Sequence, residues 1–247
     1  MIDLEVFTVS PMQYDHYHAQ RPKATKLGTY VARFSKKHTA RLLRKFAPSS
    51  PPALLEIGPG KGLFAGEFGG LFTYSCLESN ALMANVLREE GITVIEGRFP
   101  DTALEANSFD AILMEHVFEH FTSVDEQMQV LTACFQSLRP GGVLAIAAPD
   151  YAAWGKYFFL LDYTHNVPTC PERTHQMLYD TGFEILREEY STCGLRGRPI
   201  TCFLSWLAHF LDTVGATYIA GQGRRMKIVS TLLRSFHLYA RKPTGQT

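Results

Sequence analysis

The sequence predicts an α/β fold: a doubly wound sheet of seven strands, mostly parallel with an antiparallel last strand, with an N-terminal helical lid and a helical insertion before the last strand. Three observations predict it. Short apolar runs alternate with helical patterns from Ala53 to Pro149, which is typical of a parallel sheet covered by helices. Glycines crowd the turn after the first apolar run, where such a sheet binds its ligand. The connection between the last two strand patterns is far too long for a turn, which indicates an insertion.

Length and composition indicate one globular domain with its own core. The chain has 247 residues, of which 46% are hydrophobic and 19% charged, so neither a disordered nor a fibrous protein is expected. The five cysteines are an odd number without a C-x-x-C pair, which favours a reducing cytoplasm over a disulfide framework. The first residues include Asp3 and Glu5, where a signal peptide would carry bases. We therefore expect a cytoplasmic protein.

The first five strands and the helices between them follow from hydrophobic spacing. We expect the strands at Ala53–Gly58, Thr73–Glu78, Ile92–Gly97, Phe109–Glu115 and Val143–Ala148. We expect the helices at Leu63–Phe68, Leu82–Glu90 and Val124–Leu138. The last helix begins after Ser123, which has capping-box spacing with Glu126, and it ends before Pro140-Gly141-Gly142.

The rest of the chain adds a helix, two strands and the insertion. We expect the helix at Pro171–Asp180 and the strands at Phe183–Tyr190 and Phe236–Lys242. An apolar helical stripe runs through residues 200–218, and polar residues interrupt it, so we expect an interfacial or buried helix instead of a membrane span. The chain then divides into a basic arm (1–48), a core (49–192), an insertion (193–230) and a last strand with its tail (231–247).

The formal net charge is zero, but the charges are strongly segregated. Residues 21–45 hold nine bases and no acid, and residues 196–247 hold eight bases against one acid. Residues 46–195 hold 7 bases against 20 acids, a net charge of −13. This asymmetry indicates an anionic partner near the two ends, such as a membrane surface, a phosphorylated substrate or a nucleic acid. Packing of the basic arm against the acidic body explains it equally well.

The glycine-rich turn after the first strand is the first motif with chemical meaning. It reads Glu56-Ile57-Gly58-Pro59-Gly60-Lys61-Gly62, and glycines there let the backbone approach a nucleoside closely. Glu78 ends the next strand 20 residues after Gly58, the offset at which an acid accepts hydrogen bonds from ribose hydroxyls. Glu56 suits a cationic ligand better than a pyrophosphate, which favours S-adenosylmethionine over a dinucleotide. A tight turn and a surface glutamate are the structural alternative.

With further segments, this turn resembles the class I S-adenosylmethionine-dependent methyltransferases, in the group that acts on small molecules, lipids and glycans. The resemblance covers residues 50–190. Its other motifs are Leu77-Glu78, the segment from Ser108 to His120, and Leu138-Arg139-Pro140-Gly141-Gly142. It implies a Rossmann-like fold, methyltransferase activity and S-adenosylmethionine as the cofactor.

By position, the resemblance also implies which residues contact the cofactor. They lie at the ends of the first four strands: Glu56, Gly58, Pro59, Gly60, Gly62, Glu78, Ser79, Arg98, Phe99, Met114 and Glu115. The glycine turn and Glu56 would hold the methionine end, and Glu78 the ribose. Arg98 stands where the family often has an acid for the adenine amino group, so backbone groups or Phe99 would make that contact here.

Methyl transfer is an in-line displacement, so the protein mainly positions the nucleophile and removes its proton. His116 follows the fourth strand beside the cofactor and is the first candidate for the base. A second resemblance, to methyltransferases linked to cell-surface glycan building, lies in Asp162-Tyr163-Thr164-His165. It implies an active-site loop in which His165, oriented by Asp162, is the second candidate. Each histidine could instead be structural or a cofactor contact.

The segment His116-Val117-Phe118-Glu119-His120 also matches the H-x-x-E-H pattern of inverted zinc peptidases. Those histidines need consecutive helical turns to share a metal, whereas this segment straddles a predicted strand end. The methyltransferases that the chain resembles have a Glu-His pair here without a metal. We therefore expect no metal ion.

An aromatic cluster that includes Tyr14, Tyr17 and His18 precedes the basic helix. In the fold that the chain resembles, such a segment often closes over the cofactor. The resemblance therefore implies a lid that contacts the substrate, although packing within the arm is equally compatible with these side chains.

The favoured function is methylation of a small molecule, above all at an oxygen of a glycan, a lipid-linked precursor or a secondary metabolite. The basic ends and the helix near residues 200–220 would allow peripheral contact with the inner face of an anionic membrane. A catalytically silent module that binds S-adenosylmethionine and docks a partner is one alternative. A nucleic-acid methyltransferase is disfavoured, because Met114-Glu115-His116 stands where such enzymes carry an Asn-Pro-Pro-Tyr type motif. The sequence does not indicate an oligomeric state.

Overall fold

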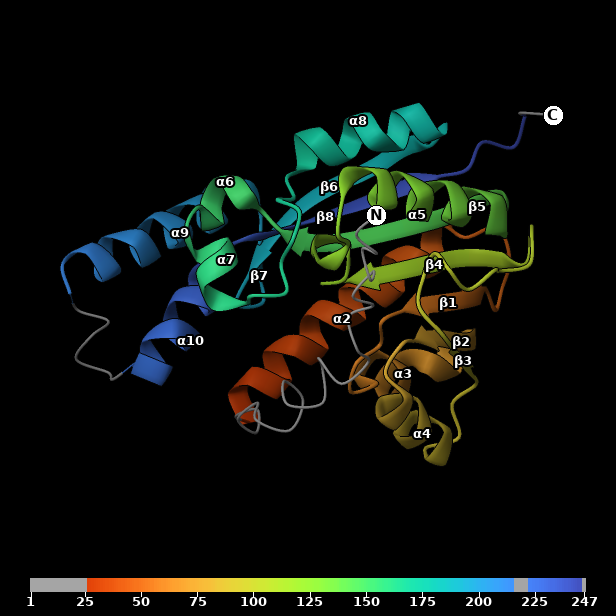
Figure 1. Cartoon of the computed structure of the whole chain (residues 1–247), viewed down its shortest axis with the longest axis horizontal. Coiled ribbons are helices and arrows are strands. Elements are labelled where there is room, and N and C mark those ends of the chain that lie inside the picture. Colours follow the sequence, from red (N-terminus) through yellow and green to blue (C-terminus); the bar gives the residue numbers. More distant parts are fainter. Residues whose placement is uncertain (1–25, 216–221, 246–247) are drawn as a thin grey trace, which may run out of the picture.

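A sheet of eight strands with helices on both faces organises the part of the chain that the structure describes (Figure 1). The structure is a computed structural model, and it describes residues 26–215 and 222–245. The predicted lid residues Tyr14, Tyr17 and His18 lie outside these ranges.

The sheet has the predicted doubly wound topology. Its strands are β1 (Ala53–Ile57), β2 (Thr73–Glu78), β3 (Val94–Glu96), β4 (Phe109–Glu115), β5 (Leu138–Pro149), β6 (Glu184–Thr192), β7 (Leu195–Arg196) and β8 (Ser235–Arg241). They lie in the order β3-β2-β1-β4-β5-β8-β6-β7. Strands β1 to β5 pair in parallel, and β8 lies antiparallel between β5 and β6. The mostly parallel sheet with an antiparallel last strand is therefore confirmed.

The predicted number of strands, seven, is one too low, because β6 continues into a hairpin. Thr192 of β6 pairs with Leu195 of β7 across the turn Cys193-Gly194. Both turn residues have positive φ, 39° and 81°, as two-residue hairpin turns require. A strand of two residues is too short to show alternation of apolar and polar side chains, so hydrophobic spacing could not predict it.

Helices cover both faces of this sheet. They are α2 (Lys26–Phe46), α3 (Leu63–Phe68), α4 (Ala81–Glu89), α5 (Val124–Ser137), α6 (Tyr151–Trp154), α7 (Tyr157–Leu161), α8 (Pro171–Thr181), α9 (Arg198–Thr213) and α10 (Gln222–Leu232), with the 3-10 helices η2 (Gly69–Leu71) and η3 (Phe118–His120). The predicted start of α5 is confirmed, because the Ser123 hydroxyl accepts a hydrogen bond from the amide of Glu126 at 3.1 Å.

Alternate residues of the central strands face two separate cores. On one face, Leu55 and Ile112 pack with α5 and α8. On the other face, Leu54 and Leu113 pack with α2 and α3. All four side chains are buried. Burial on both faces explains why the central strands appear in the sequence as continuous apolar runs.

The insertion and the connection after β5 form a helical end of the molecule, which comprises α6, α7, α9 and α10 (Figure 1). Trp154, Phe158, Ala208 and Leu233 meet there in a third core. Asp212, one of the polar residues that interrupt the apolar stripe, is buried and accepts hydrogen bonds from Arg225 at 2.7 and 3.0 Å. None of the described helices has the length and apolar character needed to cross a membrane.

Helix α2 is fixed to the body by apolar contacts at its end and charged contacts in its middle. Its last turns bury Ala40, Leu42 and Leu43 in the core. Its middle makes the ion pairs Arg33–Glu67 and Lys36–Glu115, and Nε2 of His38 lies at hydrogen-bond distance, 2.9 Å, from Oε2 of Glu189. The basic arm therefore packs against the acidic body, which is one of the two explanations for the segregated charges.

Candidate active site

Three glycines in the left-handed region shape the turn from β1 to α3. Gly58, Gly60 and Gly62 have φ of 66°, 56° and 66°, which residues with a side chain rarely adopt. A Cβ at Gly58 or Gly62 would lie 2.7 Å from the side chain of Val117 or Leu87, respectively. A Cβ at Gly60 would meet open space. The backbone at Gly60 is therefore accessible to a ligand at the carboxyl end of the sheet.

Glu78, at the end of β2, borders this turn. The amide of Asn80 donates to Oε1 of Glu78 at 2.9 Å, and the amides of Gly60 and Ser79 also donate to its carboxylate. Burial raises the pKa of Glu78 above its ordinary value despite these hydrogen bonds. The carboxylate links the glycine turn to the tip of β2, where hydroxyl groups of a nucleoside would find an acceptor.

Two carboxylates at the tips of β1 and β4 share the charge of one ammonium group from α2. Nζ of Lys36 forms an ion pair with Oε2 of Glu115, and its charge also acts on Glu56. Glu56 is only 3% exposed and accepts a hydrogen bond from the hydroxyl of Tyr74. This charge cluster of two carboxylates and one ammonium group has the chemistry to attract a cationic ligand.

Burial and charge in this charge cluster shift the pKa values of Glu56, Glu115 and Lys36 in different directions. Burial raises the pKa of Glu56 to about 7, and the charge of Lys36 and the hydrogen bond from Tyr74 oppose the rise only in part. Burial also acts to raise the pKa of Glu115, but the ion pair with Lys36 outweighs it and lowers that pKa. Burial acts to lower the pKa of Lys36, but the two carboxylates outweigh it and raise that pKa. Near neutral pH, Lys36 and Glu115 are therefore charged, while Glu56 is partly protonated.

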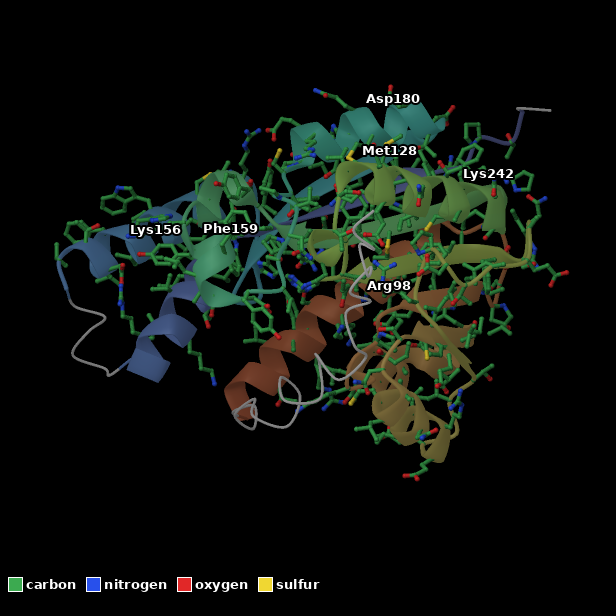
Figure 2. All side chains as sticks on the ribbon, viewed as in Figure 1. Arg98, Met128, Lys156, Phe159, Asp180 and Lys242 are labelled. Atoms are coloured by element: carbon green, nitrogen blue, oxygen red, sulfur yellow. The ribbon has the colours of Figure 1, made fainter. Side chains whose placement is uncertain are left out.

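The residues predicted to contact the adenine and to line the cofactor site differ in exposure: Arg98 is exposed, whereas Phe99 and Met114 are buried. The Arg98 guanidinium (Figure 2) pairs with Asp101 at 3.0 Å and with Glu126. Phe99 and Met114 are buried in the core that lies against α5 and α8. Their contacts with the cofactor stay predictions, as does the contact of Arg98.

His116 follows β4 in a strained backbone conformation. Its φ is 57°, a costly value for a residue with a side chain and one that is often found at functional sites. The side chain is 55% exposed, and Nδ1 lies 3.4 Å from Oε1 of Glu119. Desolvation acts to lower the pKa of His116, but Glu119 and Glu115 outweigh it and raise that pKa. His116 is therefore more often protonated at neutral pH than an ordinary histidine, so a smaller fraction of it is free to accept a proton.

The predicted active-site loop, residues 162–167, is tied to the segment after β4. The amides of Asn166 and Val167 donate to the carbonyl oxygen of Glu119 at 2.9 and 3.3 Å. Nδ2 of Asn166 donates to the carbonyl oxygen of His120 at 2.9 Å. These bonds place the loop beside the tip of β4, next to the predicted cofactor contacts Met114 and Glu115.

Within this loop, Asp162 holds Thr164 and not the ring of His165, which differs from our expectation. Oδ1 of Asp162 accepts hydrogen bonds from the amide and the hydroxyl of Thr164 at 3.0 and 2.5 Å. Nδ1 of His165 hydrogen-bonds the carbonyl oxygen of Phe158 at 2.7 Å. The short aspartate side chain bonds the backbone two residues ahead, as in an Asx turn, and this engages the oxygen that would otherwise orient the ring.

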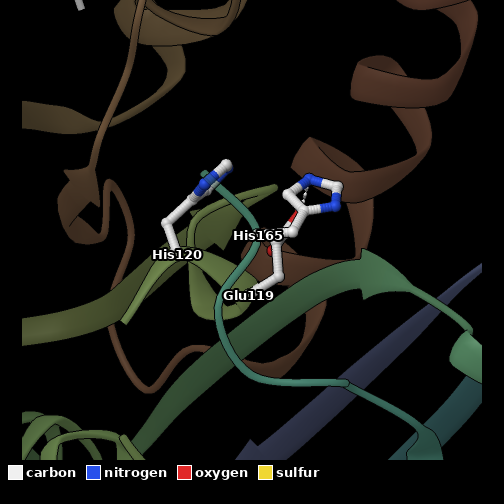
Figure 3. Close-up of side chains that lie close together, drawn as sticks. All are labelled: Glu119, His120 and His165. Atoms are coloured by element: carbon white, nitrogen blue, oxygen red, sulfur yellow. Dashed lines mark ion pairs between the residues drawn. The ribbon is translucent and has the colours of Figure 1, made fainter. Parts of the chain in front are cut away.

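Glu119, His120 and His165 come together from these two segments (Figure 3). One ligand atom from each lies within 4.8 Å of the other two. Glu119 is fully buried, and neither of its carboxylate oxygens has a hydrogen-bond partner among the described residues. Nε2 of His165 lies 3.9 Å from Oε1 of Glu119. These groups could hold a proton or a metal ion between them.

The ionisation of this cluster favours a charged glutamate and a neutral His165. Burial acts to raise the pKa of Glu119, but the nearby His116 and His120 outweigh it and lower that pKa. Burial lowers the pKa of His165. At neutral pH, an ionised carboxylate therefore faces an unprotonated imidazole.

Lys36 and Thr164 are site residues that sequence reasoning misses. Nothing in the spacing of the nine bases between residues 21 and 45 distinguishes Lys36 from its neighbours. Thr164 does carry a signal, because a residue two positions after an aspartate is the usual partner in an Asx turn.

A family model described as a methyltransferase domain matches residues 55–146. This range extends from β1 into β5 and includes the glycine turn, Glu78 and the segment from Glu115 to His120. No curated protein matches the sequence significantly.

Solved structures share the fold at low sequence identity. A SAM-dependent methyltransferase from Archaeoglobus fulgidus is 16% identical, with a TM-score of 0.56 over 88% of this chain and 100% of that chain. A cyclopropane synthase from Mycobacterium tuberculosis is 17% identical, with a TM-score of 0.60 over 91% of this chain and 87% of that chain. The domain match implies S-adenosylmethionine as the cofactor. The open backbone at Gly60 and the carboxylates of Glu56 and Glu115 fit such a cationic nucleoside.

Loss of the Glu78 carboxylate is expected to weaken cofactor binding. In calorimetric titration with S-adenosylmethionine, Glu78→Ala should bind at least tenfold more weakly, about 1.4 kcal/mol. The physical reason is the loss of the acceptor for the ribose hydroxyls at the tip of β2. Glu184→Ala, which changes an exposed acid at the opposite edge of the sheet, should keep the wild-type affinity. Equal affinities of Glu78→Ala and wild type would contradict the assignment.

Cofactor affinity should fall as the pH decreases below 7. Since burial raises the pKa of Glu56 to about 7, acid converts the carboxylate to a neutral group that no longer attracts the cationic end of the cofactor. If only the ionised form binds, the loss approaches about tenfold per pH unit well below the pKa. Titrations from pH 5.5 to 8 measure this dependence.

Two variants separate this effect from acid unfolding. Glu56→Gln should have weaker and nearly pH-independent binding over the same range. Lys36→Met should move the midpoint to higher pH, because the ammonium group favours the ionised form of Glu56. A wild-type affinity that does not change between pH 6 and 8 would argue against a role for Glu56.

Proposed function

The chain carries a class I S-adenosylmethionine-dependent methyltransferase domain, and from this premise we propose that it methylates a hydroxyl oxygen of a small molecule. The acceptor classes that we propose are a glycan, a lipid-linked precursor and a secondary metabolite. The observation that supports an oxygen acceptor is the cluster of Glu119, His120 and His165 beside the tip of β4.

Each part of the site has a separate task in this reaction. When bound, S-adenosylmethionine supplies an electrophilic methyl group on a sulfonium. Glu56 and Glu115 attract its cationic methionine end, and Glu78 accepts hydrogen bonds from its ribose. Pairing of Lys36 with Glu115 keeps that carboxylate ionised in a buried position. The methyl group would then lie near the tip of β4, from which His116 and Glu119 follow.

An alcohol oxygen needs help to become a nucleophile, because it must lose its proton as the new bond forms. The oxygen takes the methyl group, the electron pair of the broken carbon–sulfur bond stays on sulfur, and the hydroxyl proton passes to the cluster. His165 is neutral at neutral pH, and Nε2 is its free ring nitrogen, since Nδ1 bonds a carbonyl oxygen. The buried charge of Glu119 stabilises a positive charge next to it.

The test is transfer of labelled methyl groups to a panel of hydroxyl acceptors: oligosaccharides, lipid-linked sugars and phenolic metabolites. His165→Ala should lower the turnover number by about 100-fold or more, as expected for loss of the group that assists deprotonation. His175→Ala is the matched control, since His175 lies on α8 and pairs with Glu188 at 3.2 Å. This control should keep wild-type turnover.

The products and the binding data separate the alternatives. Methylation of amines without any ether product would contradict the oxygen acceptor. Binding of S-adenosylmethionine without transfer to any acceptor would favour the silent module. Binding to single-stranded or duplex nucleic acid that strengthens as salt is lowered would favour a nucleic-acid methyltransferase.

We also propose that the helical end of the molecule rests on an anionic membrane surface. The exposed apolar side chains of α9 and its C-cap form one stripe: Ile200, Phe203, Trp206, Phe210 and Val214. The rings of Trp206 and Phe210 stack with centroids 5.5 Å apart. Helices α6, α7, α9 and α10 contain one acid, Asp212, which is buried and paired with Arg225. Lys156, the N-cap of α7 in the same helical end (Figure 2), is exposed, and these helices present no surface acid to offset its charge.

Sedimentation with vesicles of phosphatidylglycerol and phosphatidylcholine at low salt tests this contact. The wild type should sediment with the vesicles, and the double variant Phe203→Ser with Trp206→Ser should bind at least tenfold more weakly, because both side chains lose buried apolar area. A control double variant, Leu82→Ser with Val86→Ser, changes exposed apolar residues of α4 instead. Wild-type protein that stays in the supernatant would contradict the membrane contact and leave the enzyme unaffected.

A further inference from the structure

Hydrogen bonds determine which ring nitrogen of His165 carries a proton. Its Nδ1 lies 2.7 Å from the carbonyl oxygen of Phe158, and a carbonyl oxygen can only accept. Nδ1 therefore carries the hydrogen, and Nε2 of the neutral ring keeps its lone pair. Nε2 is the atom that faces Glu119, at 3.9 Å from Oε1.

His120 is held in the same tautomer by Thr164. Nδ1 of His120 lies 2.9 Å from the hydroxyl oxygen of Thr164 and 3.1 Å from its carbonyl oxygen. The Thr164 hydroxyl gives its own proton to Asp162 at 2.5 Å, so its oxygen accepts from the ring. Nδ1 of His120 is thus a donor, and the lone pair of its neutral ring is on Nε2.

The carboxylate between these two rings lacks hydrogen-bond donors. Glu119 is fully buried, and both of its oxygens lack a hydrogen-bond partner among the described residues. Nδ1 of His116 lies 3.4 Å from Oε1 of Glu119, an ion-pair distance. A buried carboxylate that lacks a close hydrogen bond and has only this longer pairing with His116 is costly. Nε2 of His165 lies 3.9 Å from this carboxylate, and His120 offers a third ligand atom within 4.8 Å of both. A cation would stabilise this set of electron-pair donors.

The distances favour a metal ion over a shared proton. A hydrogen bond between a ring nitrogen and a carboxylate oxygen requires about 2.7–3.2 Å, so the 3.9 Å between His165 and Glu119 is too long. Two ligands that are each about 2.1 Å from a tetrahedral metal lie about 3.4 Å apart. The three ligand atoms, all within 4.8 Å of one another, need only small side-chain rotations to reach that geometry.

We propose that Glu119, His120 and His165 bind one divalent transition-metal ion of the zinc or iron(II) class. Two imidazoles and one carboxylate are typical ligands of such ions, whereas magnesium and calcium prefer oxygen ligands. Three protein ligands leave coordination positions open for a substrate oxygen. The ligands join the segment after β4 to a distant loop, so the site does not need the single helix of the zinc peptidases. This proposal replaces our expectation that the chain binds no metal.

The surroundings of the three ligands match those of known metal sites. Metal-bound histidines commonly donate the hydrogen of their other ring nitrogen to a carbonyl oxygen or a carboxylate-linked group, which fixes the ring. The carbonyl oxygen of Phe158 does this for His165, and Thr164 with Asp162 does it for His120. The ring of Phe158 also lies 4.6 Å from that of His165 and shields it from water.

The chemical role of the ion rests on the proposed function. A bound divalent ion lowers the pKa of a hydroxyl group that approaches it. The hydroxyl oxygen then takes the methyl group, the electron pair of the carbon–sulfur bond stays on sulfur, and the proton leaves towards solvent past the half-exposed His116. With the ion bound, the Nε2 lone pair of His165 holds the metal, so the ion takes over the help with deprotonation that the metal-free cluster would give through His165.

The test begins with metal binding in the absence of any acceptor. Full-length protein is treated with a chelator and titrated with Co²⁺, which reports ligand geometry in its visible spectrum, and then with Zn²⁺ by calorimetry. We expect one ion per chain and at least 100-fold weaker binding of Mg²⁺. Glu119→Gln and His120→Ala should each weaken Zn²⁺ binding at least 100-fold, while His175→Ala should bind like the wild type.

Thr164→Val is a second, milder variant that keeps all three ligands, so it tests the site even if a ligand variant fails to fold. It removes the hydroxyl that orients His120 and should weaken Zn²⁺ binding about 10–100-fold, as the loss of such supporting groups does elsewhere. Circular dichroism and thermal unfolding check that each variant is folded. A purely structural ion pair predicts that no variant changes Zn²⁺ affinity.

Each outcome decides one part of the proposal. Failure to bind a stoichiometric ion, or equal binding by wild type and Glu119→Gln, would overturn the site. Methyl transfer by metal-free protein at the wild-type rate would overturn the role of the ion. Stoichiometric binding without any ether product would support the site and contradict the proposed function, so the two failures are distinguishable.

Discussion

Negative charge buried at one edge of the sheet is the constraint on which the site depends. Parallel strands end at the same edge, and β1, β2 and β4 bring Glu56, Glu78 and Glu115 there, with Glu119 just beyond. A carboxylate removed from water needs hydrogen-bond donors or a cation. Backbone amides donate hydrogen bonds to Glu78. Lys36 forms an ion pair with Glu115 and offsets part of the charge of Glu56. Wherever a buried carboxylate is not fully compensated by donors or cations, a positively charged ligand binds favourably.

The same constraint connects the site to helices and loops that lie far away in sequence. Because Lys36 belongs to α2, the net charge around Glu56 and Glu115 depends on where this helix lies on the body. The loop at residues 162–167 is coupled in a similar way, since a relay of hydrogen bonds runs from Asp162 through Thr164 to the ring of His120. In the segment Asp-x-Thr-His, Asp162 holds Thr164, Thr164 orients His120, and His165 lies beside Glu119.

Much of the fold could be predicted from local patterns. Strands buried on both faces appear as continuous apolar runs, and Ser123 begins α5 with the hydrogen bond that its spacing with Glu126 predicts. Local patterns do not predict the elements whose structure depends on tertiary packing. β7 is too short to have a pattern. The aromatic connection after β5 forms α6 and α7 because it packs against α9 and α10 in a shared core.

The residues of the site fall into the same two groups, those that local sequence patterns predict and those that only tertiary packing brings together. The sequence by itself determined the glycine turn and the acid at the tip of β2, because both depend on backbone conformation and on distances of a few residues along the chain. Tertiary structure alone decided that Lys36 pairs with Glu115, 79 positions away, and that Thr164 holds His120, 44 positions away. Contacts between such distant residues form only when the whole sheet has assembled, so no periodicity or spacing in the chain encodes them in a readable form.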